Sequence, residues 1–148
     1  MDGAISVTKC SRCKLPSIVH QPYSGQHLCG RHLSDSVRRR TSRELRRQLS
    51  LPKDARKEDG SPFVVLVAVS GGKDSAVLLT MIKDIIGSRR DVKIVAGCVD
   101  EGIDGYRSPS LECARDLSGD LGVDFVTLSY EDMGYDRMDK VVSKIPGM

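Results

Sequence analysis

The sequence Ser70-Gly71-Gly72-Lys73-Asp74-Ser75 lies between two segments with different hydrophobic patterns. Residues 63–69 before it (FVVLVAV) are all apolar and mostly β-branched, which predicts a strand buried on both faces. After it, apolar side chains recur at helical spacing: Ala76, Val77, Leu78, Met81, Ile82 and Ile85. We therefore expect a strand, a tight turn and a helix in succession, the unit from which parallel α/β sheets are built.

This turn has the composition of a phosphate-binding loop. Two glycines let the backbone approach an anion closely and turn N–H groups toward it, and the new helix adds its dipole. Lys73 adds a positive charge, while Ser70 and Ser75 add hydroxyl donors or metal ligands. Neither the Walker pattern nor G-x-G-x-x-G occurs in the chain. The alternative is a tight turn in which Asp74 or Ser75 only caps the helix.

Length and composition predict one globular domain with a small additional module. The chain has 148 residues, 39% hydrophobic and 29% charged. No apolar run approaches the ~20 residues that span a bilayer, and we find no signal peptide. We therefore expect a cytoplasmic protein with no membrane partner. In that compartment its five cysteines are expected to be thiols or metal ligands rather than disulfides.

The first 33 residues contain two short cysteine and histidine motifs, Cys10-x-x-Cys13 and Cys29-x-x-His32. Their spacing predicts a tetrahedral structural Zn²⁺ site, with His27 as the reserve histidine ligand. Residues 1–33 have too little apolar content to fold alone. We therefore expect the metal to contribute the folding free energy of this zinc knuckle.

Residues 34–61 are expected to form a basic helix, over residues 34–51, followed by a linker. Ser34 or Asp35 could cap the helix, and few acidic residues offset its arginines. Six arginines form the predicted nucleic-acid surface: Arg38, Arg39, Arg40, Arg43, Arg46 and Arg47. A helix face that is merely solvated is the alternative.

Residues 62–148 are expected to repeat the strand–helix pattern. A second strand is predicted at 93–99, a helix from Ser108 to about Leu121, a third strand at 124–129, and a last helix before Pro146. This order predicts a parallel, doubly wound α/β sheet. The 70–75 and 100–107 loops both follow strands, so we expect them side by side at the carboxyl edge.

The hexapeptide resembles the pyrophosphate loop of the N-type ATP-pyrophosphatase (PP-loop) superfamily, which has an adenine-nucleotide alpha-hydrolase-like fold. Together with the knuckle and Asp100-Glu101-Gly102-Ile103-x-Gly105-Tyr106-Arg107, it resembles the tRNA 2-thiouridine synthetases of the archaeal and eukaryotic cytosolic type. The resemblance extends from about Cys10 to Pro146.

The resemblance implies a tRNA sulfurtransferase that consumes ATP, with Mg²⁺, and forms AMP and pyrophosphate. The phosphates would lie on the 70–75 loop and the adenosine against Ala68, Val69 and Val99. The C2 oxygen of a uridine would be adenylated, and sulfur would then displace AMP. Lys73 and Asp74 would be the catalytic residues of this step. Asp100 and Glu101 would face the metal or the ribose, or only cap their turn.

The chain departs from this family after its last predicted helix. The family has a Cys-x-x-Cys there, which with a later cysteine carries an iron–sulfur cluster or the sulfur-handling thiols. This chain ends at Met148 before such a pair, so we interpret it as an N-terminal part or a shortened relative. Cys98 and Cys113 are expected to pack as small apolar side chains.

The expected partners are tRNA, a ubiquitin-like sulfur carrier protein, and a second copy or another subunit. Two other functions remain open at this point. One is a non-catalytic zinc and ATP-binding module that binds tRNA or a partner subunit. The other is a different adenylating ligase of the PP-loop superfamily.

Overall fold

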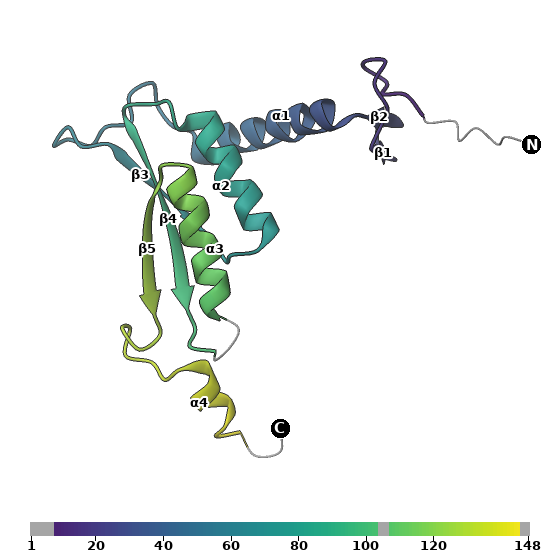
Figure 1. The fold of residues 1–148 in the computed structure, drawn as a ribbon. Coiled ribbons are helices and arrows are strands. Elements are labelled where there is room, and N and C mark those ends of the chain that lie inside the picture. The colour runs from purple at the N-terminus through teal and green to yellow at the C-terminus, as the bar shows by residue number, and fades with distance from the viewer. Residues whose placement is uncertain (1–7, 104–106, 146–148) are drawn as a thin grey trace, which may run out of the picture. The chain divides into compact units, whose positions relative to one another are not determined.

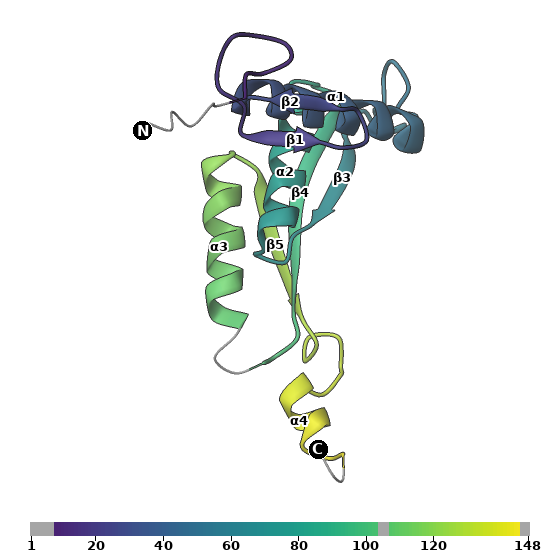
Figure 2. The same ribbon diagram turned by 90° about the vertical axis from the view of Figure 1, so that its right-hand side faces the viewer.

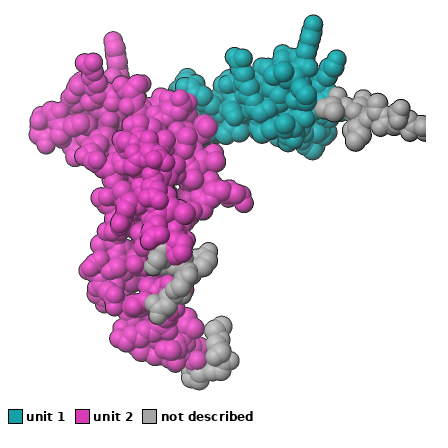
Figure 3. Space-filling view, in the orientation of Figure 1, with its two compact units in different colours: residues 1–50 teal, residues 51–148 magenta. Residues whose placement is uncertain are grey.

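The computed structural model describes residues 8–103 and 107–145, and it divides into two compact units, residues 1–50 and 51–148 (Figure 3). Part of the predicted 100–107 loop and the Pro146-Gly147 helix end lie outside the described residues. The basic helix, which we expected to begin a middle segment, belongs to the first unit. Among the described residues, no helix is long and apolar enough to cross a membrane.

The first unit consists of a β-hairpin and one long helix. The strands β1 (Val19–Gln21) and β2 (Gln26–Leu28) pair antiparallel, and α1 (Gly30–Leu49) follows directly. We did not predict the hairpin, because strands of three residues are too short to show an alternating pattern.

The start of α1 differs from the prediction. Its N-cap is Cys29, without a side-chain hydrogen bond, so the expected cap at Ser34 or Asp35 is wrong. The N–H of Leu33 donates to the carbonyl oxygen of Cys29 at 2.9 Å and closes the first turn. The helix therefore begins inside the Cys29-x-x-His32 motif.

The second unit is a three-stranded parallel sheet with helices between its strands (Figure 1). Its strands, in spatial order, are β3 (Phe63–Ala68), β4 (Val92–Asp100) and β5 (Asp124–Ser129). Its helices are α2 (Lys73–Ile86), α3 (Arg107–Asp120) and α4 (Met138–Val142). The predicted parallel α/β fold is confirmed, with strand boundaries within one residue of those expected.

Both crossover helices, α2 and α3, cover the same face of the sheet (Figure 2). Because the strands follow one another in sequence order, two right-handed crossovers place their helices on one side. The second layer of helices that a doubly wound sheet has is not seen among the described residues, so that part of the prediction stays a prediction. The face toward the helices contains the core residues Val65, Val67, Ile94, Ala96 and Cys98.

The prediction that residues 63–69 are buried on both faces is wrong. Alternate residues of β3 point away from the helices, and Leu66 is 63% exposed. Leu66 and Val126 lie over Gly97 on this second face, where a Cβ on Gly97 would be 2.9 Å from Leu66. On α2, Leu79, Ile82 and Ile86 are buried, whereas Val77 and Leu78 are about half exposed.

An ion pair fixes the linker to the start of β4. The carboxylate of Asp91 is buried, accepts a 2.7 Å hydrogen bond from the N–H of Ala55, and pairs with the guanidinium of Arg89. Arg89 also donates to the carbonyl oxygen of Pro52 at 2.7 Å. Hydrogen bonds from Arg89 and Ala55 hold the pKa of Asp91 well below its usual range.

We expect Asp91→Asn to lower the melting temperature of the chain by roughly 5 °C at pH 7, because it leaves Arg89 without its charged partner. Since the pKa is lowered by folding, the carboxylate stabilises the fold above the unfolded value of 3.8, and this contribution disappears at lower pH. Thermal unfolding from pH 7 to pH 3 measures both effects. The matched control is Asp54→Asn, which breaks an exposed ion pair of the same linker. Equal shifts for the two variants would contradict the anchoring role.

Candidate functional site

The predicted phosphate loop lies between the end of β3 and the start of α2. The N–H of Val69 extends the sheet by donating to the carbonyl oxygen of Gly97 at 2.8 Å. The chain then turns at Gly71, whose φ of 79° is a left-handed conformation that glycine adopts without strain. Helix α2 begins two residues later at Lys73.

Two serine hydroxyls hold the loop closed on itself. The Ser75 hydroxyl accepts a hydrogen bond from the N–H of Ser70 at 3.1 Å and donates to the carbonyl oxygen of Gly72 at 3.0 Å. It also lies 3.2 Å from the hydroxyl of Ser70. Ser75 therefore shapes the loop, and the Ser70 hydroxyl is exposed at its surface.

The first turn of α2 presents backbone N–H groups that no side chain caps. Its N-cap is Gly72, which has no side chain to offer, and no side-chain cap bond is formed. The alternative in which Asp74 or Ser75 only caps the helix is therefore wrong. Lys73 and Asp74 are exposed, and neither forms an ion pair with the described residues. Free N–H groups, a helix dipole and an unpaired lysine together favour an anion here.

A pocket of about 190 Å³ opens between this loop and α3. It is lined by Gly71, Gly72, Lys73 and Ser75 from the loop, and by Val69, Ala76, Cys113, Ala114 and Leu117 around it. This volume is below the roughly 300–1,000 Å³ of pockets that hold whole ligands, and it suits the phosphate part of a nucleotide.

The three predicted adenosine contacts do not lie on one face of the sheet, because side chains alternate between its two faces along each strand. Val69 is buried on the helix-covered side and lines the pocket. Ala68 is paired with Gly97, and Val99 with Leu128, on the opposite face of the sheet. The contact of adenosine with all three stays a prediction.

The thiol of Cys113 was not expected at this site. It is exposed and lines the pocket, so the interpretation of Cys113 as a packed apolar side chain is wrong. Cys98, by contrast, is buried as expected. The sequence could not place Cys113, because only the crossover geometry brings α3 next to the loop.

The loop after β4 is stabilised by its own residues. The carboxylate of Asp100 accepts a 2.9 Å hydrogen bond from the N–H of Gly102, which is the turn-capping role. The carbonyl oxygen of Glu101 accepts from the N–H of Met138 at 2.9 Å, and Arg137 donates to that of Gly102 at 3.4 Å. These contacts connect the loop to the start of α4. Gly105 and Tyr106 lie outside the described residues.

The structure brings Cys10, Cys13, Cys29 and His32 together. Their four ligand atoms lie within 4.8 Å of one another. The Cys10 and Cys29 sulfurs are 3.3 and 3.4 Å from Nδ1 of His32, and Cys13 and Cys29 are 3.7 Å apart. Ligands placed 2.0–2.3 Å from a tetrahedral ion are separated by about 3.3–3.8 Å. These three of the six pairwise distances match a tetrahedral site with sulfur and nitrogen ligands.

Hydrogen bonds at this cluster favour the thiolate form of Cys10. Burial alone raises the pKa of the Cys10 thiol, but hydrogen bonds from the backbone of Arg12, Cys29 and Cys13 outweigh it and lower the pKa to about 6. The reserve ligand His27 is excluded, because its ring stacks on His20 at 4.5 Å and is not part of the cluster.

The six predicted arginines of α1 are all exposed. At about 100° per residue, five of them share a sector of about 120° on the helix, and Arg38 lies outside it. We call these five the arginine stripe: Arg39, Arg40, Arg43, Arg46 and Arg47. Arg47 pairs with Glu44 at 2.7 Å, and the guanidinium of Arg40 lies 4.4 Å from the ring centre of Tyr23. The remaining members have no carboxylate partner among the described residues.

Gly71 lies close to the backbone of α3. A Cβ at this position would lie 2.2 Å from the carbonyl oxygen of Ser110 and 2.7 Å from its Cα. Both are backbone atoms, which cannot rotate away. Any other residue here would have to displace the loop or the helix.

We expect Gly71→Ala to destabilise the chain and to open the loop, because it combines backbone strain with a steric clash. The matched control is Gly60→Ala, since Gly60 has the same φ of 79° with nothing within 4 Å of its Cβ position. Thermal unfolding should show a decrease of a few degrees for Gly60→Ala, from left-handed strain of about 1–2 kcal/mol, and a clearly larger one for Gly71→Ala. Equal decreases would mean that the contact with Ser110 is not tight.

Comparisons with known proteins agree with this geometry. Residues 9–34 match the family described as 2-thiouridine synthetase TtuA, N-terminal LIM domain. The tRNA 2-thiolation protein NcsA of Haloferax volcanii is 38% identical over 93% of this chain and 42% of its own length. The Cytoplasmic tRNA 2-thiolation protein 1 of Drosophila pseudoobscura pseudoobscura is 42% identical over 83 residues, 55% of this chain and 24% of that protein.

A solved structure has the same fold. The U34-tRNA thiolase NcsA from Methanococcus maripaludis, described with its [4Fe-4S] cluster, superposes with a TM-score of 0.70 and 27% identity. The superposition covers 94% of this chain and 44% of that one. The chain thus spans less than half the length of the relatives that it matches. Over 93% of its length the chain is therefore similar to part of a tRNA 2-thiolation protein, and its first segment is similar to the N-terminal LIM domain of a 2-thiouridine synthetase.

Proposed function

We propose that this chain binds ATP and tRNA for the 2-thiolation of a tRNA uridine. The observation that carries the proposal is the uncapped start of α2 behind a glycine loop, with Lys73 unpaired beside it. Its similarity to tRNA 2-thiolation proteins supports the choice of a uridine as the group to be activated.

The proposed reaction has two steps. The C2 oxygen of the uridine attacks the α-phosphorus of ATP, and the bond to the β-phosphate oxygen breaks to release pyrophosphate. The sulfur of a carrier thiocarboxylate then attacks C2, and the C2–oxygen bond breaks to release AMP. Hydrolysis of the acyl–sulfur bond leaves the thiocarbonyl on the base and a carboxylate on the carrier, with no change of oxidation state. The first step places negative charge on the phosphates, which Lys73, the N–H groups of the loop and Mg²⁺ are suited to stabilise. Asp74, exposed on the same turn, is the residue we assign to orienting Mg²⁺ or the loop.

The cysteine and histidine cluster is proposed to bind Zn²⁺ in a structural role. Its four protein ligands leave no open position for a substrate, as in other structural zinc sites. The core around them is small: among the residues that the structure describes, the buried members of this cluster are Cys10, Leu28 and Cys29. A unit with so little buried apolar surface depends on its metal for folding.

The described residues do not provide a second metal cluster. The Methanococcus thiolase is described with a [4Fe-4S] cluster. In the described parts of this chain, the knuckle is the one group of three or more cysteine, histidine or acidic side chains close enough to hold a metal. We therefore derive no step of the reaction through an iron–sulfur cluster on these residues.

The arginine stripe is the proposed contact with the tRNA backbone. Its guanidinium groups face one side of α1 and are exposed, as phosphate contacts require. For the sulfur step we propose a ubiquitin-like carrier protein as donor, and a second copy or subunit as further partners. A cytoplasmic location fits these partners and the name of the Drosophila relative.

A binding module without catalysis is the second candidate function. The observation that favours it concerns the two cysteines outside the knuckle. Cys98 is buried and Cys113 is the one cysteine that lines the pocket, so the two do not form a pair of thiols at the nucleotide site. Incubation of the chain with tRNA, ATP and a sulfur source distinguishes the two. Thiouridine in the digested tRNA supports the enzyme, whereas binding of ATP and tRNA without thiouridine supports the module.

We expect Lys73→Ala to weaken ATP binding by roughly 10-fold to 100-fold, because it removes a charged contact with the phosphates. Isothermal titration with ATP and Mg²⁺ measures the change, and the zinc content should stay constant. Lys53→Ala, a lysine of the linker, is the matched control. If Lys73→Ala binds ATP as tightly as the unmodified chain, the assignment of residues 70–75 as the phosphate loop is contradicted.

We expect Cys29→Ser to lower the bound zinc from one ion per chain to a small fraction and to unfold the first unit. Metal analysis of the purified protein and proteolysis of residues 1–50 measure the two effects. Cys113→Ser is the control, because this exposed thiol is not part of the cluster. Full zinc retention in Cys29→Ser would contradict the ligand assignment.

A further inference from the structure

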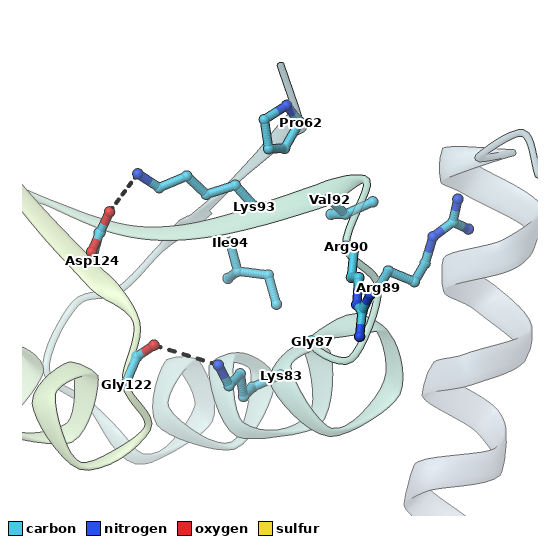
Figure 4. Close-up of a pocket in the computed structure, with 10 residues that line it drawn as sticks. All are labelled: Pro62, Lys83, Gly87, Arg89, Arg90, Val92, Lys93, Ile94, Gly122 and Asp124. Carbon is cyan, nitrogen blue, oxygen red and sulfur yellow. Dashed lines mark hydrogen bonds and ion pairs between the residues drawn. The ribbon is translucent and has the colours of Figure 1, made fainter. Parts of the chain in front are cut away.

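A second pocket lies at the edge of the sheet opposite the nucleotide loop. It has a volume of about 420 Å³ and is built from the first residues of β4, the start of β5 and the end of α2 (Figure 4). Four of its lining side chains are cationic, Lys83, Arg89, Arg90 and Lys93, and one, Asp124, is acidic. The buried side chains of Val92 and Ile94 form its apolar part.

Two of the four cations are engaged in ion pairs. Arg89 pairs with Asp91 and donates to the linker, so its role is structural. Lys93 pairs with Asp124 at 2.6 Å, and both side chains are more than half exposed. Solvent screens such a pair and makes it weak. An incoming anion can therefore compete for Lys93.

The other two cations have no carboxylate partner among the described residues. Lys83 donates a long 3.4 Å hydrogen bond to the carbonyl oxygen of Gly122, and Arg90 is exposed in the turn before β4. Figure 4 shows Lys83 reaching toward Gly122 below the strand that carries Lys93. The pocket thus holds two positive charges that no described carboxylate neutralises.

The dipole of α2 explains why one of these cations is favourable at this position. Lys83 lies in the last turn of α2, where a cation is favourable. The effect falls off within that turn, so it does not explain Arg90 or Lys93 on the neighbouring elements. A ligand with more than one negative charge would explain cations that come from a helix, a turn and a strand.

We propose that this pocket binds phosphate groups of the RNA backbone. The inference rests on the proposed function, in which the substrate is a tRNA. The cationic side chains are long and at least partly exposed, and no buried donor in the described part of the pocket fixes a small anion. Exposed lysine and arginine side chains are typical of contacts with a polyanion. Since α2 has 14 residues at about 1.5 Å each, the pocket lies roughly 20 Å from the nucleotide loop. A tRNA that contacts this pocket while its uridine lies at the nucleotide loop would extend along α2 over this distance.

The test measures binding of an unmodified tRNA transcript to the full chain at two salt concentrations. We expect Lys83→Gln/Arg90→Gln to weaken binding about 10-fold and to reduce the slope of log affinity against log salt by about 2. Lys53→Gln/Lys57→Gln removes the same charge from the linker and should have a much smaller effect. Lys83→Arg/Arg90→Lys keeps the charge and should restore the affinity, which separates lost phosphate contacts from misfolding.

Two further measurements separate this inference from the proposed function. Arg43→Gln/Arg47→Gln tests the arginine stripe, and titration with ATP tests the nucleotide loop. If the stripe variant loses affinity while the pocket variant equals the linker control, the pocket inference alone is overturned. If the unmodified chain binds no tRNA, both the proposed RNA substrate and the pocket inference are overturned. Loss of pyrophosphate binding in the pocket variant, with tRNA affinity unchanged, would assign the pocket to a small anion instead.

Discussion

The second unit depends on the close approach of Gly71 to the backbone of Ser110. A Cβ at Gly71 would overlap backbone atoms of α3, so only glycine lets the loop and the helix meet. This contact closes one wall of the nucleotide pocket and brings Cys113 to its edge. It also fixes the start of α2, because the residue after Gly71 is the N-cap of that helix. Pocket, loop and helix start are therefore consequences of one backbone contact.

In the first unit, the metal-ligand geometry takes the role that a hydrophobic core has elsewhere. Cys29 and His32 lie at the N-cap and in the first turn of α1, and Cys10 and Cys13 come from the segment before the hairpin. Helix α1 begins at Gly30, so His32 belongs to its first turn. The arginine stripe lies further along the same helix. Ordering of the cluster therefore also orders the helix that carries the proposed RNA contacts.

The features that the sequence predicted correctly are those with a local cause. The strand–turn–helix unit, the parallel strands and the clustering of three cysteines with His32 each follow from spacing or periodicity within a short segment. The errors concern properties that depend on distant segments. Residues 63–69 look like a strand buried on both faces, but both crossover helices of this unit lie on one side of the sheet, and Leu66 on the other side is exposed. The position of Cys113 likewise depends on how α3 packs.

The two ends of α2 explain why both proposed phosphate contacts lie where they do. At its first turn, free N–H groups and the positive end of the dipole attract an anion, and a single lysine completes the site. At its last turn the dipole is negative and would repel a phosphate. Binding there needs side-chain cations in excess of that dipole. The turn and the strand that follow α2 supply them, with Arg90 and Lys93 beside Lys83. The proposed phosphate site at the start of α2 therefore uses the helix dipole, whereas the proposed RNA site at its end depends on side-chain charges that outweigh the dipole.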